Sequence, residues 1–223
     1  MGQAIQQAAG DTAGICASRV WKRGESLDAV VAAVDVLIDF SLPDATAEVL
    51  AAVQKHRKPL VCGVSGLNAE QMTAIERAAM EIPVVYDRNM SQGVAVLADL
   101  VKRAASSLGS EFDVEVHEVH HVHKVDAPSG TALKLGEAIE SVRAVGGDGV
   151  RYAVERRGEV PGEHTVTFAS PTETLSLKHS VTNRQVFAAG AIRAAQWITR
   201  QPAGLYQMRD VLFGEINRKK TPG

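Results

Sequence analysis

The first 90 residues alternate short apolar runs rich in Val and Ile with longer segments of helical periodicity. The runs at residues 13–17, 35–40, 60–64 and 83–86 are expected to be strands. Two of the segments between them begin with helix-start signals, Pro43 with Asp44 and Asn68 with Glu70. Because parallel strands must be joined by crossover connections, this alternation predicts βα units on a parallel sheet of nucleotide-binding type.

The pattern changes after residue 90. A helix expected over residues 91–108 leads into residues 112–116, whose period of two predicts a strand with one buried face. After a further helix (residues 131–143), alternating segments at 150–157, 163–169 and 174–181 predict an antiparallel sheet. A last helix over 184–199 returns to the first part. The predicted fold is therefore α/β: a Rossmann-type sheet from residues 1–90 plus 184–223, with an α+β domain inserted at 91–183.

Composition narrows the class of protein. The 223 residues are 45% hydrophobic and 22% charged, which is typical of a globular chain, and the formal charge of -2 gives no positive field for nucleic acid or an anionic membrane. No run approaches the roughly 20 apolar residues of a membrane span, and the first residues lack the pattern of a signal peptide. Cys16 and Cys62 lie in apolar runs and are expected to be buried thiols. We therefore expect a cytoplasmic protein with no nucleic-acid or membrane partner.

Four of the seven histidines fall between positions 117 and 123, a clustering that favours a functional site over a solvated strand end. One hypothesis is zinc, because residues 117–121 (HEVHH) match the H-E-x-x-H pattern of metalloproteases. That pattern needs a helix, since His117 and His121 would lie about 13 Å apart along a strand. The run follows an alternating strand and ends at Pro128, which disfavours a helix, so we expect no metal.

A second hypothesis uses the start of the following helix. Ser129 is a good N-cap, and the first-turn amides of Gly130 and Thr131 have no partners within a helix, so they predict a seat for a carboxylate or phosphate. His120 and Lys124 lie just upstream and are candidate proton donors. The sequence therefore predicts a pocket for a small anion.

The stretch 118–132 (EVHHVHKVDAPSGTA) closely resembles the signature of the dihydrodipicolinate reductase family, which reads E-x-H-H-x-x-K-x-D-A-P-S-G-T-A. Supporting similarities lie along nearly the whole chain, at residues 36–41 (VLIDFS), 63–66 (GVSG), 89–94 (NMSQGV), 190–195 (GAIRAA) and 204–208 (GLYQM). The resemblance implies reduction of 4-hydroxy-tetrahydrodipicolinate to tetrahydrodipicolinate, with loss of water, in lysine and diaminopimelate biosynthesis. The cofactor that it implies is NADPH or NADH.

The resemblance also implies residue roles. His120 and Lys124 take the family's catalytic positions, and His121, Gly130 and Thr131 take its substrate-binding positions. Lys124 is the first choice of proton donor, because an ammonium group also stabilises a dicarboxylate. Asp126 is expected to be structural, at the turn before Pro128.

Cofactor contacts implied by the resemblance follow two strands and extend to the N-terminal region. They are Gly2, Arg19, Gly63, Val64, Ser65, Asp87, Arg88, Asn89 and Met90. Ligands of open parallel sheets bind at the carboxyl ends of the strands, where most of these residues are expected. Arg19 could pair with a 2′-phosphate, which favours NADPH.

The sequence departs from the family at its N-terminus. The family begins with a strand and a G-x-x-G-x-x-G turn, and Met1 and Gly2 correspond only to the last part of that turn. Either the sequence starts too late, or it is a fragment with impaired cofactor binding that leaves a non-catalytic binding module as an alternative. The resemblance further implies a homotetramer that assembles through the sheet of the inserted domain.

Overall fold

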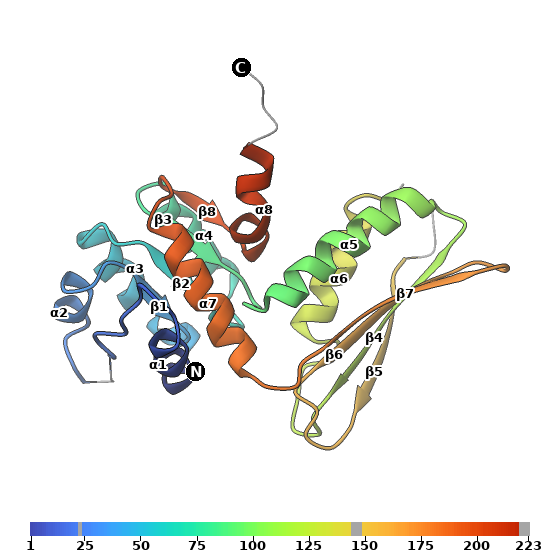
Figure 1. Cartoon of the computed structure of the whole chain (residues 1–223), viewed down its shortest axis with the longest axis horizontal. Helices are drawn as coiled ribbons and strands as arrows, with labels where there is room; N and C mark the ends of the chain where they lie inside the picture. Colours follow the sequence, from blue (N-terminus) through green and yellow to red (C-terminus); the bar gives the residue numbers. More distant parts are fainter. Residues whose placement is uncertain (22–23, 144–148, 219–223) are drawn as a thin grey trace. The chain divides into compact units, whose positions relative to one another are not determined.

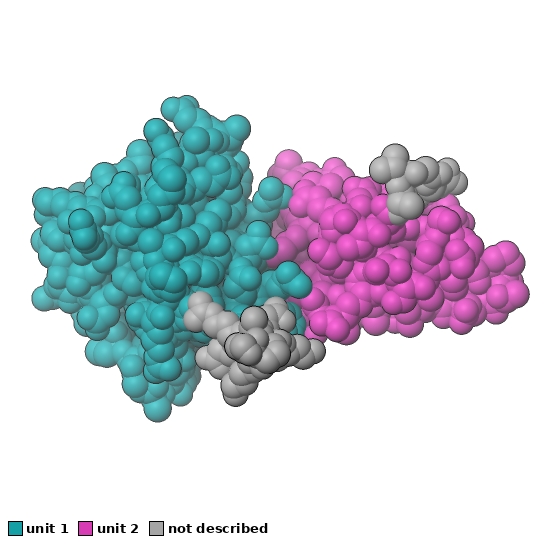
Figure 2. Space-filling model, turned by 90° about the horizontal axis from the view of Figure 1, so that it is seen from above, with its two compact units in different colours: residues 1–92, 185–223 teal, residues 93–184 magenta. Residues whose placement is uncertain are grey.

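A computed structural model describes residues 1–21, 24–143 and 149–218 (Figure 1). The chain divides into two compact units, which Figure 2 shows in different colours. Unit 1 comprises residues 1–92 and 185–223, and unit 2 comprises residues 93–184. No helix in the described part of the chain is both long and apolar enough to cross a membrane.

Unit 1 is built on a four-stranded parallel sheet. Its strands, in spatial order, are β1 (Leu37–Asp39), β2 (Leu60–Cys62), β3 (Pro83–Tyr86) and β8 (Gly204–Tyr206). Their side chains form a buried apolar core together with the surrounding helices. The first three strands confirm the sequence prediction, whereas β8 was missed because residues 204–206 (GLY) do not form the Val- and Ile-rich run that marks the other strands.

The helices of unit 1 surround this sheet. They are α1 (Gly2–Gly10), α2 (Leu27–Ala32), α3 (Thr46–Lys55), α4 (Ala69–Ala79), α7 (Gln185–Ile198) and α8 (Met208–Arg218), with a short 3-10 helix η1 (Pro43–Ala45) before α3. Asn68 caps α4 through a capping box with Gln71, as the sequence predicts. Helix α7 packs against β1, β2 and β3 and against α1. At Gly190 of α7 a Cβ would collide with the carbonyl oxygen of Met90, so this contact excludes any side chain.

The strand predicted over residues 13–17 is wrong, because the segment is turn and coil. A strand is stable when a neighbour completes its hydrogen bonds, and no strand pairs with this segment among the described residues. The expectation that Cys16 is buried is wrong for the same reason, since its side chain is exposed; Cys62, on β2, is buried. Residues 13–21 instead line a cavity of about 1370 Å³ that also runs along β1.

Unit 2 holds a second four-stranded sheet. Its elements are α5 (Gln92–Leu108), β4 (Asp113–His120), α6 (Gly130–Glu140), β5 (Arg151–Arg156), β6 (Glu163–Ala169) and β7 (Thr174–Ser180). The spatial order is β5-β4-β6-β7. The prediction of an antiparallel sheet is wrong for one pair, because β5 runs parallel to β4 while β6 and β7 are antiparallel to their neighbours. Helix α6 joins β4 to β5, and such a crossover makes the two strands parallel.

The two faces of this second sheet differ. Helices α5 and α6 lie on one face, as Figure 1 shows, and bury an apolar core against it. The other face carries no helix among the described residues of unit 2. It presents polar side chains that pair with one another, among them His117 with Glu155 and Lys178 with Glu163. The functional side chains described next come from the helix-covered face.

Candidate functional site

Strand β4 carries the histidine run and separates its members. Because alternate residues of a strand point to opposite faces, Glu118 and His120 share the covered face with Val116, whereas His117 lies on the other face near Glu155. The run is therefore strand up to His120, as expected, and His117 and His121 are not stacked as zinc ligands on a helix.

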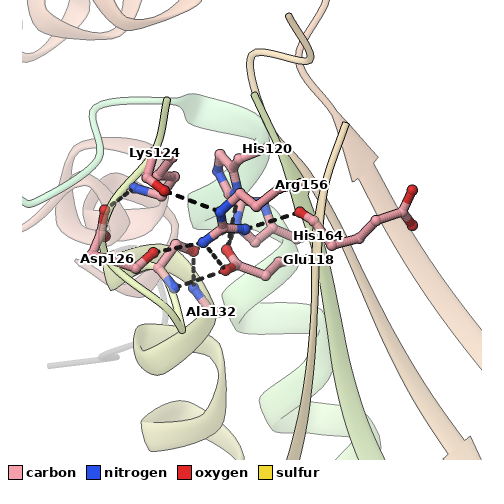
Figure 3. A network of polar contacts seen from close by, with 9 residues as sticks. Glu118, His120, Lys124, Asp126, Ala132, Arg156 and His164 are labelled. Carbon is pink, nitrogen blue, oxygen red and sulfur yellow. Dashed lines mark hydrogen bonds and ion pairs between the residues drawn. The ribbon is translucent and has the colours of Figure 1, made fainter. Parts of the chain in front are cut away.

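Glu118 is completely buried and lies at the centre of a polar network (Figure 3). Its Oε1 accepts hydrogen bonds from the Ser129 amide at 3.1 Å and from Arg156 Nη2 at 3.2 Å. Burial disfavours its charged form, but hydrogen bonds from Ser129, the charge of His120 and the Arg156 guanidinium together hold the pKa of Glu118 below its usual value. The carboxylate is therefore ionised at neutral pH.

Arg156, at the end of β5, ties this carboxylate to the loop that follows β4. Its Nε donates to the Lys124 carbonyl at 3.2 Å, and its Nη2 donates to the Asp126 carbonyl at 2.6 Å. Figure 3 shows the guanidinium between Glu118 and this loop. The position of Lys124 therefore depends on an arginine more than 30 residues away in the sequence.

Two imidazoles face the second oxygen of Glu118. His120 Nδ1 lies 3.0 Å and His164 Nε2 lies 4.0 Å from Oε2, and the two rings meet edge to face with centroids 5.1 Å apart. Burial lowers the pKa of His120, with Lys124 and Arg156 acting in the same direction and Glu118 against it. Burial and the neighbouring His120 lower the pKa of His164 to about 4, so that ring is neutral at pH 7.

The other ring nitrogen of His120 lies beside Gly162. This glycine is buried and has φ of 154°, and a Cβ on it would lie 3.1 Å from His120 Nε2 and 3.9 Å from His164 Cε1. A side chain at position 162 would therefore press on both imidazoles, and His120 itself is only 6% exposed. Glycine at this position lets the two rings lie where they do.

Lys124 and Asp126 form an ion pair in the loop between β4 and α6, with Nζ and Oδ1 2.6 Å apart. Burial raises the pKa of Asp126, but the Lys124 ammonium and backbone amides, including that of Gly130, lower it below its usual value. The carboxylate of Asp126 thus interacts both with the Lys124 ammonium and with the N-terminus of α6. These contacts add to the structural role in the turn before Pro128 that the sequence predicts.

Helix α6 begins as predicted. Ser129 is its N-cap, its Oγ accepts the Ala132 amide at 3.1 Å, and Oγ also lies 3.2 Å from His164 Nε2. Gly130 and Thr131 are the first two helical residues and are half-buried, as is His121. The structure therefore brings His120, Lys124 and the α6 N-terminus together around Glu118.

The predicted cofactor residues lie in unit 1, in two groups. Gly2 and Arg19 both line the cavity along β1, and Gly2 opens α1, whose first turn has no side-chain cap. Such a helix start, together with Arg19, suits the phosphates of a dinucleotide. The other group follows the carboxyl ends of β2 and β3 and does not line this cavity.

The second group is held by backbone contacts at the edge of the sheet. The Gly63 amide donates to the Asp39 carbonyl at 2.8 Å, and a Cβ on Gly63 would overlap the ring of Phe40. Val64 is buried and Ser65 is exposed. The turn after Cys62 therefore passes so close to the end of β1 that it requires glycine.

The residues after β3 are largely engaged within unit 1. Asp87 is buried, and its carboxylate accepts the amides of Asn89 at 3.1 Å and Met208 at 3.3 Å. Met90 is buried, whereas Arg88 is exposed. The side chain of Asp87 thus fixes the turn and the start of α8, and the neighbouring Arg88 is an exposed charge that interacts with Tyr86.

Comparisons with known proteins agree with this arrangement. The family model for the N-terminus of dihydrodipicolinate reductase matches residues 1–90, and the model for its C-terminus matches residues 93–212. The chain belongs to the dihydrodipicolinate reductase family. A 4-hydroxy-tetrahydrodipicolinate reductase from Pseudoalteromonas translucida is 45% identical over 202 residues, which are 83% of this chain and 76% of the relative. The corresponding enzyme from Xanthomonas euvesicatoria is 48% identical over 181 residues, 81% of this chain and 74% of the relative.

A solved structure supports the fold. The dipicolinate-bound dihydrodipicolinate reductase from Paenisporosarcina sp. TG-14 superposes with a TM-score of 0.66 at 23% identity, covering 78% of this chain and 71% of the other. The Rossmann-type parallel sheet followed by a second α/β unit is therefore the fold of this reductase family.

Three residues of the network escaped the sequence reading. Arg156 and His164 lie on β5 and β6, and nothing in their local sequence marks them as partners of β4. Glu118 is part of the family signature, yet only its buried position reveals its contacts. The period of two could have placed Glu118 on the same face as His120.

Glu118, His120 and His164 together raise the question of a metal, because their ligand-type atoms all lie within 4.8 Å of one another. The charges around it argue otherwise. The Arg156 guanidinium occupies Oε1 of Glu118, and both Arg156 and Lys124 add positive charge that opposes a cation. The arrangement suits an internal ion-pair network better than a metal centre.

Proposed function

We propose that His120 and Lys124 supply protons in the reaction of this family, the NAD(P)H-dependent reduction of 4-hydroxy-tetrahydrodipicolinate to tetrahydrodipicolinate with loss of water. The observation that supports these roles most directly is the buried Glu118 network, which gathers His120, the Lys124 loop and the α6 N-terminus in one place. A nicotinamide cofactor, when bound, supplies the hydride.

The two donors would act differently. Lys124 holds its charge beside Asp126, so its ammonium can both stabilise a substrate carboxylate and deliver a proton. His120 has Nδ1 on the side of Glu118 and Nε2 on the side of Gly162, and Nε2 is the nitrogen proposed for proton exchange. Electron density placed on the substrate ring must end in a new C–H bond, and a positioned acid provides the proton.

Substrate binding is proposed for His121, Gly130 and Thr131. A small dicarboxylate needs two anion seats, and the helix start of α6, where the Gly130 amide bonds Asp126, offers one when the substrate replaces that carboxylate. Lys124 and His121 precede this helix start in the sequence and provide positive or hydrogen-bonding partners for the second carboxylate. Entry of the substrate would require Lys124 to exchange Asp126 for a substrate carboxylate.

Cofactor binding is proposed for Gly2, Arg19, Gly63, Val64, Ser65, Asp87, Arg88, Asn89 and Met90. Arg19 is exposed on the cavity along β1 and is free to approach a 2′-phosphate, so we infer a preference for NADPH over NADH. Changing Arg19 to Ala should raise the KM for NADPH more than that for NADH. Equal KM values for both cofactors in the unaltered chain would contradict this preference.

Further properties follow from the same proposal. We infer a cytoplasmic homotetramer that assembles through the polar, helix-free face of the second sheet, with no nucleic-acid or membrane partner and no metal. Mass determination in solution tests the tetramer. Metal analysis tests the last point, because stoichiometric zinc lost together with activity on chelation would overturn it.

The deciding experiment follows NADPH absorbance while a coupled source supplies 4-hydroxy-tetrahydrodipicolinate. Lys124→Ala and His120→Ala should each lower kcat by about 10²- to 10⁴-fold, the usual contribution of a general acid. Lys55→Ala, which removes an exposed lysine paired with Asp28 in unit 1, is the matched control and should leave kcat unchanged. Retention of activity within about threefold in both site variants would refute the assigned roles.

A further inference from the structure

Glu118 is a buried charge to which the proposed reaction gives no part. Its side chain is fully excluded from solvent, and its two oxygens face different partners. Oε1 faces the Ser129 amide and Arg156, and Oε2 faces the imidazoles of His120 and His164. Burying a carboxylate is costly, and apolar residues of similar size often give equal or greater stability, so its presence calls for a reason other than stability.

We propose that Glu118 is a positioning residue: it supplies the counter-charge for His120 and, through Arg156 and the Ser129 amide, fixes the Lys124 loop and the start of α6. The inference rests on the proposed role of His120. It makes one buried carboxylate responsible for the placement of both proposed proton donors, His120 and Lys124. Glu118 itself need not touch substrate.

The first half of the argument concerns Oε1. One oxygen accepts from the helix start at Ser129 and from Arg156, and the same Arg156 Nη2 also donates to the Asp126 carbonyl at 2.6 Å. Through this one oxygen, Glu118 of β4 is linked to the start of α6 directly and, by way of Arg156 of β5, to the loop that carries Lys124. Loss of the carboxylate would leave Arg156 as an uncompensated, largely buried charge and would loosen the loop that carries Lys124.

The second half concerns Oε2. This oxygen lies 3.0 Å from His120 Nδ1, yet neither atom is aligned for a hydrogen bond. An electrostatic attraction needs no such alignment, so the contact becomes strong when His120 takes up a proton. With Nδ1 toward Oε2, Nε2 lies on the side of Gly162, where a Cβ would be 3.1 Å from it.

His120 is faced by charged or titratable groups from every neighbouring element. They are Glu118 on its own strand, Lys124 and Asp126 from the loop, Arg156 from β5 and His164 from β6, with His179 of β7 beyond His164. Glu118 and Asp126 favour the protonated ring, whereas Lys124 and Arg156 oppose it. Glu118 raises the pKa of His120 and Arg156 lowers it. Removing each partner in turn should therefore shift this pKa in opposite directions, and that provides the test.

The experiment is an NMR titration of the His120 ring in the full chain without substrate or cofactor, with the resonance assigned from its loss in His120→Asn. Glu118→Gln should lower the pKa of His120 by about 1 to 2 units, the range expected when a close opposite charge is removed. Arg156→Met should raise it. A purely structural role would move both values in the same direction, and that result, or an unchanged pKa in Glu118→Gln, would overturn the proposal.

The matched control is Glu155→Gln. Glu155 lies on β5 next to Arg156 but points to the opposite face of the sheet, where it pairs with His117 and Arg157. The same chemical change there should leave the titration of His120 unaltered. A shift as large as that of Glu118→Gln would show that any lost carboxylate acts through general charge, and would count against a specific counter-charge.

Glu118→Gln could fail to fold because Arg156 would lose its partner. The double variant Glu118→Gln/Arg156→Met removes both charges and leaves neither unpaired. Its His120 pKa should lie below that of Arg156→Met alone, because only the Glu118 charge distinguishes the two chains. Equal values in this pair would refute the counter-charge.

Turnover provides a second readout. In Glu118→Gln the limb of the pH profile of kcat that reports His120 should move to lower pH, in step with the shift seen by NMR. At pH 7, kcat should fall about 10- to 100-fold, while the substrate KM should change less than about threefold. An enzyme with unaltered pH profile and raised KM would contradict positioning of a proton donor. Absence of NADPH oxidation in the unaltered chain would refute the proposed function and would leave the titration result standing.

Discussion

The candidate site residues of unit 2 are connected to one another by side-chain hydrogen bonds and ion pairs. Those of unit 1 lie mostly in turns after strands, where backbone contacts set their positions. In unit 2, Glu118 and Arg156 join β4, β5, a loop and α6 through hydrogen bonds with named atoms on both sides. In unit 1, Arg19 lines the cavity along β1, and Gly63 follows the carboxyl end of β2 with its amide bonded to the Asp39 carbonyl. The difference shows that the candidate donor site is built from side-chain contacts within one unit, while the candidate cofactor positions are set mainly by the path of the backbone.

The strongest way to break this comparison is to disrupt unit 1 alone. Gly190→Ala places a methyl group against the Met90 carbonyl oxygen, where neither backbone can yield, and should lower the free energy of unfolding by about 3 kcal/mol or more. Thermal unfolding and denaturant titration measure the loss. NMR signals of His120 and His164 should keep their native positions under conditions where unit 1 is unfolded.

Gly10→Ala is the control for this variant, because it too adds a methyl group at a helical glycine of unit 1, but no atom lies within 4 Å of the added Cβ. Its stability should equal or slightly exceed that of the unaltered chain. If Gly190→Ala also displaced the histidine signals, the site in unit 2 would depend on unit 1 after all.

A second prediction uses the buried imidazole of unit 2. The pKa of His164 falls from 6.5 to about 4 on folding, so between these values the unfolded chain binds more protons than the folded one. Stability should therefore decrease as pH falls from about 6.5 to about 4, by up to about 3 kcal/mol for this group. Burial lowers the pKa of His120 and of His179 as well, so both add in the same direction.

Denaturant unfolding at several pH values checks the slope. His164→Gln should flatten it within this window, whereas His123→Gln, which alters an exposed histidine outside the network, should not. A slope that is unchanged in His164→Gln would mean that the buried ring is not the source of the dependence.

The smallest expected effect concerns the ion pair in the loop. Asp126→Asn removes the carboxylate that holds Lys124 and should strengthen binding of the proposed dicarboxylate substrate by about three- to tenfold, because the ammonium no longer exchanges one carboxylate for another. Calorimetric titration measures the affinity. Asp113→Asn changes an exposed aspartate at the other end of β4 and serves as the control. Weaker binding in Asp126→Asn would show that this carboxylate orients Lys124 and does not compete with the ligand.

The sequence predicted those parts of the molecule whose signals are local. Apolar runs predicted β1, β2 and β3, and the cap at Asn68 was confirmed by a capping box. The helix start at Ser129 was likewise confirmed. These features depend on hydrogen bonds and packing within a few residues, which the sequence states directly.

The errors arose where a distant partner decides the outcome. Residues 13–17 have the composition of a strand but lack a neighbour to pair with, and Cys16 is exposed in consequence. The direction of β5 is set by the crossover through α6 and not by its own alternation. Arg156 and His164 reach Glu118 across 38 and 46 positions of the chain, and no local pattern carries such pairings.

The glycine at position 162 has a consequence for which sequences this turn can accept. It is buried, and a Cβ on it would lie 3.1 Å from His120 Nε2 and 3.9 Å from His164 Cε1. Any larger residue would push against two imidazoles that are already enclosed. The two histidines therefore restrict the choice of amino acid at a position in a turn to which neither of them belongs.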